Sequence, residues 1–370
     1  MTKSVLHTVR QAGLLVSLFL FGLAVACQTK PDANEPTPNP TPTEPGGVDY
    51  KTTPVALRKP ANFPDPVYDL THNPLTVEGV ALGKSLFYDT HLSRDSSVSC
   101  GFCHQQFAGF AHSDHPLSHG IDDRIGTRNV PGLQNMAWSR EFFWDGGVTD
   151  LNTLFIAPIT NPVEMDMKFA DVLVRVQKSP KYPSMFKNAF GSDTVTTARF
   201  LKAISQFVLT LVSADSRYDK YVRNEAGGVL TSDELAGLAV FKQKCASCHA
   251  TDLFTDHSYR NNGLPASGIN DQGRYTITLN EADRLKFKVP SLRNVENTFP
   301  YMHDGRFTTL DQVLNHYASG VKDSPTLDAA LKMNGQLGIA LTDTEKKQVI
   351  SFLKTLTDNT FMTNRAFGPN

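Results

Sequence analysis

The chain has 370 residues, with 36 Lys or Arg against 37 Asp or Glu, so its formal net charge at pH 7 is −1. Because the charges balance, the composition gives no indication of nucleic acid or another polyanion as a partner. The length predicts either two domains or one large domain.

Residues 1–27 have the pattern of an export signal. A positive start, with Lys3 and Arg10, precedes an apolar run over residues 14–25 that is too short to span a membrane comfortably. The run ends in Ala24-Val25-Ala26-Cys27, which resembles a bacterial lipoprotein processing site, although Ala stands where Leu is usual. Ordinary cleavage before the cysteine is the alternative. We expect a lipid anchor at Cys27 on the periplasmic side of a bacterial membrane or, without the lipid, a soluble periplasmic protein.

Residues 28–60 are predicted to be a solvated tether. Six prolines between Pro31 and Pro45 are interleaved with Thr, Asn and Glu, which leaves almost nothing to build a core. Such a segment is partly polyproline-II and would hold the folded part away from a membrane surface. Globular composition begins at about residue 61.

Apolar spacing in the first half of the globular part predicts helices. Residues 77–87 (VEGVALGKSLF) have helical spacing. Residues 105–135 are rich in His, Gly and Asp and are expected to be mostly loop. Amphipathic helices are expected over residues 169–176 and 200–212, and the second of these is apolar enough to lie in the core.

Gly227-Gly228 marks the predicted start of a second half. A capping box over residues 231–234, Thr followed by Glu three positions later, opens a helix that runs to Phe241. A second capping box over residues 342–345 precedes a predicted helix over residues 346–358, which closes the chain.

Each half contains one C-x-x-C-H pentapeptide, directly after a predicted helix. The two copies are Cys100-Gly101-Phe102-Cys103-His104 and Cys245-Ala246-Ser247-Cys248-His249. This pattern is the signature of a covalently attached c-type haem, in which two thiols bond to the haem vinyl groups and the histidine ligates the iron. Cys27 alone remains, so no disulfide framework is left to explain. We therefore predict two covalently bound haem c groups, attached outside the cytoplasm.

The predicted fold class is mainly α. It consists of two cytochrome c-like domains, residues 61–226 and 227–370, each around one covalent c-type haem. Strand-like alternation is scarce, and residues 273–279 (GRYTITL) are the only strand candidate in the sequence, expected as a short hairpin.

Further motifs accompany the haem signatures at matching spacing. They are GTRNVP at 126–131, FWDG at 143–146, NPVEM at 161–165, KVPSLRN at 288–294 and PYMHDG at 300–305. Over about residues 61–365 the chain thereby resembles the bacterial dihaem cytochrome c peroxidase family, which also includes the MauG-type enzymes.

The resemblance implies a division of labour between the two haems. The N-terminal haem, on Cys100, Cys103 and His104, is expected to react with hydrogen peroxide. The C-terminal haem is expected to take electrons from a small cytochrome c or cupredoxin and relay them; it would be held by Cys245, Cys248 and His249. Family members are often dimers, so a homodimer is also an expectation.

The resemblance also implies a distal histidine on the N-terminal haem. In the peroxidases this histidine lies in a Gly-His-Gly loop and leaves the iron on activation, and Ser118-His119-Gly120 matches that position. His112 and His115 are rivals for the role, and the alternative for each is an imidazole in a surface loop.

Glu164 is the expected catalytic acid and base. Cleaving a peroxide requires a proton to pass from its inner to its outer oxygen, and a carboxyl group whose pKa is raised by burial can carry that proton. A surface Glu that caps a turn is the alternative.

Two departures from the family are Leu154, in place of a common Gln that would add a distal hydrogen-bonding partner, and Gly147, in place of the usual Arg.

Trp144 resembles the tryptophan that lies between the two haems in the family, where its role would be electron transfer. A buried aromatic residue in a crowded interface is a compatible interpretation. Trp138 has no such motif and is expected to be structural.

The second axial ligand of the C-terminal haem distinguishes the subtypes. It is Met in the peroxidases and Tyr in MauG-type enzymes, and alignment from residues 309–313 places Tyr317 at this position. An anionic phenolate lowers the haem potential, whereas Met raises it. Met302 and His316 are the alternatives, and Tyr317 also fits a core tyrosine with a satisfied hydroxyl.

The resemblance further implies Ca²⁺ at the interface between the domains. Asn129 would contribute its side-chain oxygen, and Thr298 and Pro300 their backbone carbonyls. Hard oxygen ligands with several waters suit Ca²⁺, although these residue types alone do not indicate a metal.

Three functions follow from these residues. The first is reduction of hydrogen peroxide to water with electrons from a small redox protein. The second is a MauG-like oxidase that uses peroxide to oxidise a partner protein or small molecule, which Tyr317 favours. The third is a dihaem electron carrier without enzymatic activity, against which Glu164 counts.

Overall fold

The computed structural model describes residues 50–369 with the exception of residues 266 and 334. These described residues belong to one compact unit. The predicted export signal, Cys27 and most of the predicted tether lie outside the described residues. Within the described part, no helix combines the length and the apolar character needed to cross a membrane.

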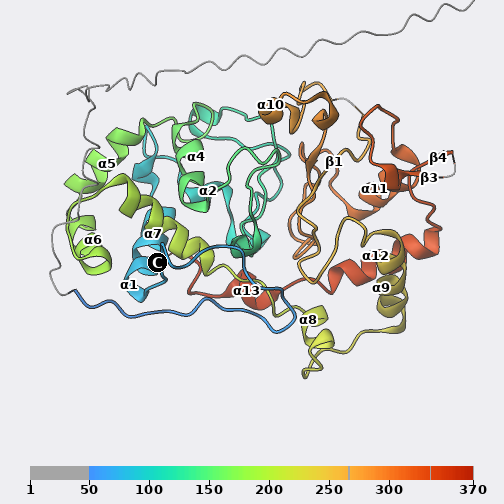
Figure 1. Ribbon diagram of the computed structural model, residues 1–370, viewed down its shortest axis with the longest axis horizontal. Helices are drawn as coiled ribbons and strands as arrows, with labels where there is room; N and C mark the ends of the chain where they lie inside the picture. The colour runs from blue at the N-terminus through green and yellow to red at the C-terminus, as the bar shows by residue number, and fades with distance from the viewer. Residues whose placement is uncertain (1–49, 266, 334, 370) are drawn as a thin grey trace, which may run out of the picture. The chain divides into compact units, whose positions relative to one another are not determined.

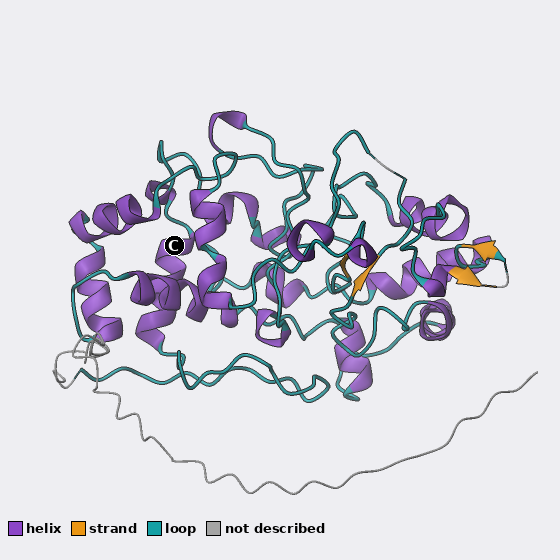
Figure 2. Cartoon of the chain, turned by 45° about the horizontal axis from the view of Figure 1, so that its top comes forward, coloured by secondary structure: helices purple, strands orange, loops and turns teal. Residues whose placement is uncertain are grey.

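Helices and loops make up nearly all of the described chain, as Figure 2 shows. The elements up to residue 222 are α1 Val77–Phe87, η1 Thr90–Leu92, α2 Cys100–Cys103, η2 Gln106–Ala108, η3 Ile121–Asp123, η4 Met136–Trp138, α3 Leu151–Leu154, α4 Ile156–Thr160, α5 Phe169–Lys178, α6 Tyr182–Phe190, α7 Thr197–Leu209 and α8 Arg217–Val222. The elements that follow are α9 Ser232–Lys244, β1 Tyr259–Arg260, α10 Tyr275–Thr278, η5 Glu281–Asp283, β2 Phe287–Lys288, α11 Leu310–Asn315, the π-helix η6 His316–Gly320, η7 Ala329–Leu331, β3 Lys332–Met333, β4 Gln336–Leu337, α12 Asp343–Lys354 and α13 Asn359–Thr363.

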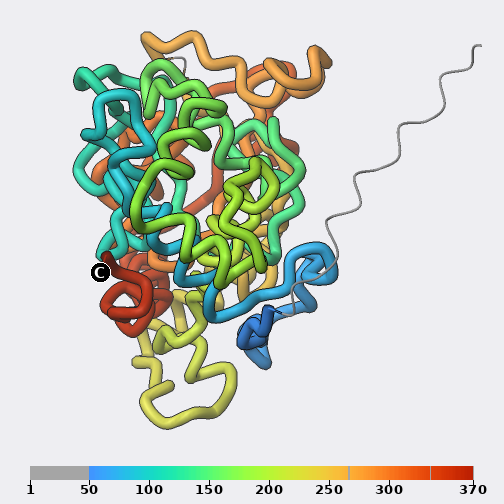
Figure 3. Tube along the Cα trace, turned by 90° about the vertical axis from the view of Figure 1, so that its left-hand side faces the viewer, coloured from blue at the N-terminus to red at the C-terminus, as the bar shows by residue number. Residues whose placement is uncertain are grey.

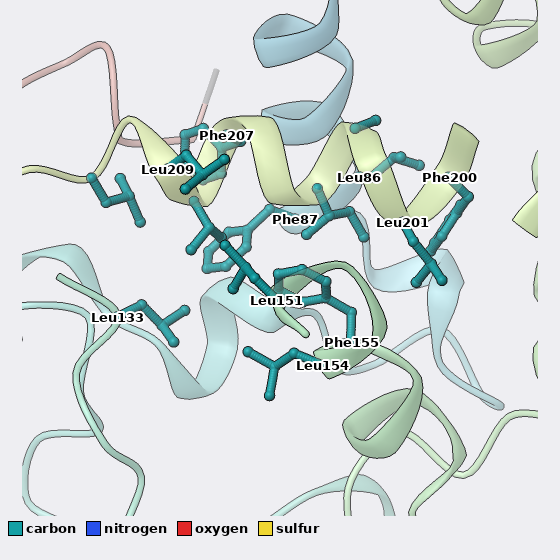
Figure 4. Packing of buried hydrophobic residues seen from close by; sticks show 14 of the residues in the cluster. Leu86, Phe87, Leu133, Leu151, Leu154, Phe155, Phe200, Leu201, Phe207 and Leu209 are labelled. Atoms are coloured by element: carbon teal, nitrogen blue, oxygen red, sulfur yellow. The ribbon is translucent and has the colours of Figure 1, made fainter. Parts of the chain in front are cut away.

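The core of the first half forms where α1 packs on α7. Thr76 caps α1 by accepting a hydrogen bond from the backbone N–H of Gly79, at 3.0 Å. The two helices approach closely at Gly83, where a Cβ would lie 1.9 Å from the carbonyl oxygen of Ala203. Apolar residues from α1, α3 and α7 fill this core, as Figure 4 shows for Leu86, Phe87, Leu151, Leu154, Phe155, Phe200, Leu201, Phe207 and Leu209.

The second half repeats this arrangement with α9 and α12, which lie side by side in Figure 1. Both helices begin with a capping box, formed by Thr231 with Glu234 and by Thr342 with Glu345. A Cβ at Gly237 would lie 2.0 Å from the carbonyl oxygen of Gln348 on α12, so a glycine again permits close packing. In each half, the helix that precedes the C-x-x-C-H motif is therefore fixed against a second long helix.

The helices predicted over residues 77–87, 169–176, 200–212, 231–241 and 346–358 are confirmed as α1, α5, α7, α9 and α12, with differences of a few residues at their ends. The mainly α fold class is likewise confirmed. The predicted division at residues 226–227 stays a prediction, although the buried apolar residues do form two clusters.

The strand predicted over residues 273–279 is wrong. Residues 275–278 form the single helical turn α10, bracketed by Gly273 and Leu279, which both have positive φ. The Thr276 hydroxyl donates to the carbonyl of Gly273 at 2.8 Å, a local bond that competes with strand pairing. The strands instead pair as β1 with β2 and β3 with β4, both antiparallel, and each has only two residues.

The C-terminal end of the chain returns to the first half. Phe361 and Met362 of α13 belong to the apolar cluster of the first half, and Figure 3 shows this red segment beside blue and teal segments. Just before it, the backbone N–H of Asp358 donates to the side-chain oxygen of Asn294, at 2.7 Å. The two halves thus share buried structure beyond the loops that connect them.

A buried polar junction ties the halves together. The side-chain amide of Asn294 donates to Gln134 at 2.8 Å and to Ser213 at 3.0 Å. Next to it, the guanidinium of Arg293 pairs with Asp219 at 2.7 Å, and both side chains are fully buried. This junction fixes the loop after β2, which lines the cavity described next.

Candidate active site

One cavity of about 1290 Å³ contains both C-x-x-C-H motifs. Residues of both halves line it, and these include Cys100, Cys103, His104, Cys245, Cys248 and His249. The pocket is large enough for more than one drug-sized ligand, which normally occupies about 300–1,000 Å³. A shared cavity places the two predicted haem sites next to one another.

The two motif histidines have matching hydrogen bonds. His104 donates from Nδ1 to the carbonyl of Phe110 at 2.7 Å, and His249 donates from Nδ1 to the carbonyl of Phe254 at 3.1 Å. Burial lowers the pKa of both imidazoles, that of His104 to about 4, so both are neutral at pH 7. A neutral ring with Nδ1–H bonded to a backbone carbonyl presents Nε2 as the ligand nitrogen, which is the usual arrangement of a metal-binding histidine.

The four motif cysteines form no disulfide among the described residues. Burial raises the pKa of Cys100, Cys103 and Cys245 to about 12, and it also raises the pKa of Cys248. Neutral thiols and a neutral imidazole at the wall of a largely apolar cavity fit a haem group in each half.

Glu164 lines the same cavity and lies in the turn after α4. Burial raises the pKa of its carboxyl group, and its charge in turn raises the pKa of Cys100 and Cys103. The amide of Asn161 donates to Oε1 at 2.9 Å, which orients the carboxyl and leaves Oε2 as the second oxygen. The carboxyl therefore lies at the first C-x-x-C-H motif.

Gly120 and Ile121, where the loop enters η3, contact the backbone of Glu164. The backbone N–H of Ile121 donates to the carbonyl of Glu164 at 2.9 Å. A Cβ at Gly120 would lie 2.3 Å from that carbonyl oxygen, so a larger residue would displace one of the two segments. The predicted Ser-His-Gly motif thus positions Glu164 through its glycine.

Trp144 bridges the two halves at the cavity wall. Its indole N–H donates to the carbonyl of Asn129 at 2.8 Å, and its own carbonyl accepts from the backbone N–H of Lys288 on β2 at 2.7 Å. The predicted position of Trp144 between two haems stays a prediction. Trp138 is buried and donates to the carbonyl of Pro64 at 2.8 Å, away from the cavity lining.

The imidazole of His119 does not line the cavity, whereas its neighbour Ser118 does. The ring lies instead with those of His112 and His115, at centroid distances of 5.0 and 4.6 Å. His119 contacts the first motif in two ways: its ring packs edge-on against that of Phe102 at a centroid distance of 5.2 Å, and its carbonyl oxygen lies 3.6 Å from Sγ of Cys103. The distal role of His119 stays a prediction, as does that of its two rivals.

Tyr317 and Met302 both line the cavity, and His316 does not. Tyr317 belongs to η6, and burial, together with the nearby thiols of Cys248 and Cys245, raises its pKa to about 12. Met302 accepts at Sδ from the amide of Asn262 at 3.5 Å. The π-helical turn therefore places Tyr317 at the second motif.

His316 lies outside the lining because its own hydrogen bond holds it elsewhere. It is 5% exposed, and Nε2 donates to the carbonyl of Asn262 at 3.0 Å. As a ligand candidate it is therefore less well placed than either Tyr317 or Met302.

Asn129, Thr298 and Pro300, the residues predicted to bind Ca²⁺, also line the cavity. The amide of Asn129 donates to the carbonyls of Pro116 at 3.0 Å and His115 at 3.3 Å. Next to Thr298 in the chain, Oδ1 of Asn297 is buried without a hydrogen-bond partner among the described residues. An unsatisfied buried oxygen beside two candidate ligands fits a bound cation.

Two cavity residues were not predicted from the sequence. Lys288 donates from Nζ to the carbonyl of Glu141 at 2.5 Å, and burial lowers its pKa to about 8. Both ring nitrogens of His257 are buried without a partner among the described residues, and burial lowers the pKa of this imidazole to about 4. Neither residue was assigned a role from the sequence, although Lys288 opens the KVPSLRN motif, because only the fold shows that both line the cavity.

Comparisons with known proteins agree on one family. Residues 77–227 match the family model for di-haem cytochrome c peroxidase. The methylamine utilization protein MauG of Methylorubrum extorquens is 36% identical over 309 residues, which cover 81% of this chain and 83% of that protein. Cytochrome c551 peroxidase of Nitrosomonas europaea is 36% identical, with 77% of this chain and 81% of that protein covered.

The structural comparison gives the same answer. The crystal structure of a MauG-like protein associated with microbial copper homeostasis matches with a TM-score of 0.76 and 30% identity, covering 85% of this chain and 99% of that one. Fold and site thus define an oxidoreductase of the haem peroxidase class with two haem groups. The chain belongs to the di-haem cytochrome c peroxidase family, in which the MauG proteins are included.

Proposed function

We propose that the chain reduces hydrogen peroxide to two molecules of water beside Glu164, with two protons and two electrons, and that a small cytochrome c or cupredoxin supplies the electrons. The observation that carries this proposal is the Glu164 carboxyl group, which shares the cavity with the first C-x-x-C-H motif and has a raised pKa because it is buried. A plain electron carrier has no use for such a group.

The residues that would hold the two haems are the six of the C-x-x-C-H motifs. Cys100 and Cys103 would form thioethers to the first haem, and Cys245 and Cys248 to the second. His104 and His249 would each present Nε2, because Nδ1 is already bonded to a backbone carbonyl. When bound, the two haems supply the redox chemistry that delivers electrons to peroxide.

Glu164 would move the proton that cleavage of the peroxide requires. Its Oε1 accepts from Asn161, so Oε2 is free to accept the proton of the inner peroxide oxygen and return it to the outer one. A carboxyl group with an unperturbed pKa of about 4.3 is a weak base at neutral pH, and burial shifts Glu164 toward the pKa at which such transfer is efficient.

Trp144 is the residue proposed to carry electrons between the halves. It contacts Asn129 in the first half and Lys288 in the second through hydrogen bonds of 2.8 and 2.7 Å. The first bond orients the indole, and the second fixes the Trp144 backbone against β2.

Replacement of Glu164 by Gln tests this function. Peroxide-dependent oxidation of a reduced small cytochrome is expected to fall by about 10²–10⁴-fold, the usual contribution of a general acid–base group. The absorbance of both haems should stay unchanged, because Gln has nearly the same shape. Glu281→Gln is the matched control, since this side chain is exposed, forms a surface ion pair with Arg284 and lies outside the cavity lining. Turnover of Glu164→Gln within about threefold of the unchanged chain would refute the proposed role.

A second candidate function is a MauG-like oxidase that uses peroxide to oxidise a protein or small molecule. Tyr317 favours it, because its hydroxyl lies at the second C-x-x-C-H motif, where a phenolate would lower the haem potential. Two relatives that each cover 81% of this chain also carry the name MauG. In the first candidate function a small redox protein gives up the electrons, whereas in the second the oxidised protein or small molecule gives them up.

Tyr317→Phe tests the ligand role of the tyrosine. If the phenolate binds the C-terminal haem, the substitution should change the spectrum of that haem and raise its reduction potential. Tyr221→Phe is the control, because Tyr221 is exposed on α8. An unchanged spectrum and potential would remove Tyr317 as a ligand and leave Met302 as the candidate.

Calcium and location complete the proposal. Ca²⁺ would bind Asn129, Thr298 and Pro300, and the unpartnered oxygen of Asn297 supports it. The chain would act on the periplasmic side of a bacterial membrane, anchored through a lipid on Cys27, because its N-terminus has the pattern of a lipoprotein signal.

A further inference from the structure

Three imidazoles gather on the loop between the first C-x-x-C-H motif and η3. The rings of His112, His115 and His119 lie pairwise at centroid distances of 4.5, 5.0 and 4.6 Å. One ring nitrogen from each lies within 4.8 Å of the other two. Neither the dihaem site nor the proposed calcium site uses all three rings.

Their hydrogen bonds leave nitrogens available for a ligand. His112 is 2% exposed, and its Nδ1 is buried without a partner among the described residues. The same is true of Nε2 of His119. His115 donates from Nδ1 to the carbonyl of Ser113 at 3.1 Å, so Nε2 is its basic nitrogen. Buried polar atoms without partners are rare in proteins, and two in one cluster point to a missing partner.

The loop that carries the rings is braced on both sides. Asn129 donates to the carbonyls of His115 and Pro116, at 3.3 and 3.0 Å. Gly305 of the second half packs on Pro116, where a Cβ would lie 2.1 Å from the carbonyl oxygen. The backbone N–H of Ser118 donates to the carbonyl of Arg128 at 2.9 Å. The cluster is therefore held by the fold and is not a chance meeting of free side chains.

We propose that His112, His115 and His119 form a binding site for a divalent transition metal ion of the Zn²⁺ and Cu²⁺ type, with the fourth ligand position open to solvent. Three imidazoles without a carboxylate suit these ions and not Ca²⁺ or Mg²⁺, which prefer oxygen. Because His115 is exposed, the ion can reach the site from outside.

The distances fit such an ion after a modest closure. Zn–N bonds of about 2.0–2.1 Å in a tetrahedral site separate two ligand nitrogens by about 3.3 Å. The nitrogens lie at most 4.8 Å apart, so each pair must close by at most about 1.5 Å, which rotation of the three rings can supply.

Zinc is the probe because it is redox-inactive and does not absorb where haem does. The full-length holoenzyme is first treated with a chelator, which is then removed. It is next kept in excess Ca²⁺ so that oxygen-ligand sites are filled. Binding of Zn²⁺ is then measured by calorimetric titration at pH 7.5. Elemental analysis after dialysis then gives zinc relative to haem iron. We expect one zinc ion for every two haem irons.

His115→Gln is the decisive variant, since the side chain is exposed and lies outside the cavity lining. Loss of one of three ligands should weaken Zn²⁺ binding by at least about 10–100-fold, the range that loss of a ligand's supporting partner alone produces. His72→Gln is the matched control, because His72 is an exposed histidine outside the cluster and should bind zinc like the unchanged chain. The proposal is overturned if the unchanged holoenzyme takes up no stoichiometric zinc or if His115→Gln binds it equally well.

Discussion

Replacing Arg293 by Met is expected to destabilise the folded chain by about 3–5 kcal/mol, the cost of breaking a buried ion pair on one side. The side chain is fully buried in the junction between the halves and donates to both carboxylate oxygens of Asp219, at 2.8 and 2.7 Å. Its Nε also donates to the carbonyl of Asp252 at 2.8 Å. Met fills much of the same volume but offers no donor and no charge.

The size of this loss in stability follows from the hydrogen bonds that are lost and from those that remain. Each lost hydrogen bond to a charged group is worth about 1.5–3 kcal/mol, so the two bonds to Asp219 amount to about 3–6 kcal/mol. Asp219 stays buried but keeps bonds from the Ser216 hydroxyl at 2.7 Å and the Asn62 amide at 3.0 Å, which limit the loss. The expected loss of stability therefore lies within the range for removing one partner of a buried ion pair.

Urea denaturation of the holoenzyme, followed by circular dichroism, measures the change. Lys332→Met is the control, because the Lys332–Asp323 pair is about half exposed and surface pairs contribute about 0–1 kcal/mol. Pairing Arg293→Met with Asp219→Leu should recover much of the loss, since removing both charges avoids an unpaired one. A loss below about 1 kcal/mol for Arg293→Met alone would refute the reasoning.

The same pair predicts a dependence on pH. Burial acts to raise the pKa of Asp219, but hydrogen bonds from Arg293 and Ser216 outweigh it and hold the pKa below its usual value. A carboxyl group with a lowered pKa stabilises the fold above its unfolded pKa of about 3.9, and that contribution is lost as the pH falls through the folded value. The difference in stability between the unchanged chain and Arg293→Met should therefore shrink in acid.

Three further predictions concern the active site. In Gly120→Ala the new Cβ would meet the Glu164 carbonyl at 2.3 Å, so steady-state peroxide turnover should fall while the haem content stays unchanged. Trp144→Phe loses the bond to Asn129 at 2.8 Å, and rapid mixing should show slower electron transfer between the haems. Because burial raises the pKa of Glu164, turnover should drop as the pH falls through a value above about 4.3, and Glu164→Gln should lose that limb of the pH profile.

Much of the fold could be predicted because its signals are local. The capping boxes at Thr231 and Thr342 need only four consecutive residues, and both are present in the structure. The failed strand over residues 273–279 shows the limit of such signals. Alternating apolar and β-branched residues also fit one helical turn, and the hydrogen bond from the Thr276 hydroxyl to the carbonyl of Gly273 favours the turn over a strand.

The site could be predicted in its chemistry but not in its arrangement. The spacing within each C-x-x-C-H motif is local, whereas the shared cavity depends on contacts between the halves. The adjacent residues His316 and Tyr317 look alike as ligand candidates, and the π-helical turn places the second alone in the lining. The grouping of His119 with two other rings likewise depends on side-chain directions in a loop.

The most direct test of the account is peroxide-dependent oxidation of a reduced small cytochrome, compared between the fully oxidised holoenzyme and the holoenzyme first reduced by one electron. The account predicts reaction with peroxide in at least one of the two states. Turnover of the cytochrome only after reduction would indicate a gated peroxidase, and fast reaction of the oxidised enzyme with little cytochrome oxidation would indicate the MauG-like function that Tyr317 favours. No reaction with peroxide in either state would contradict the account and leave an electron carrier.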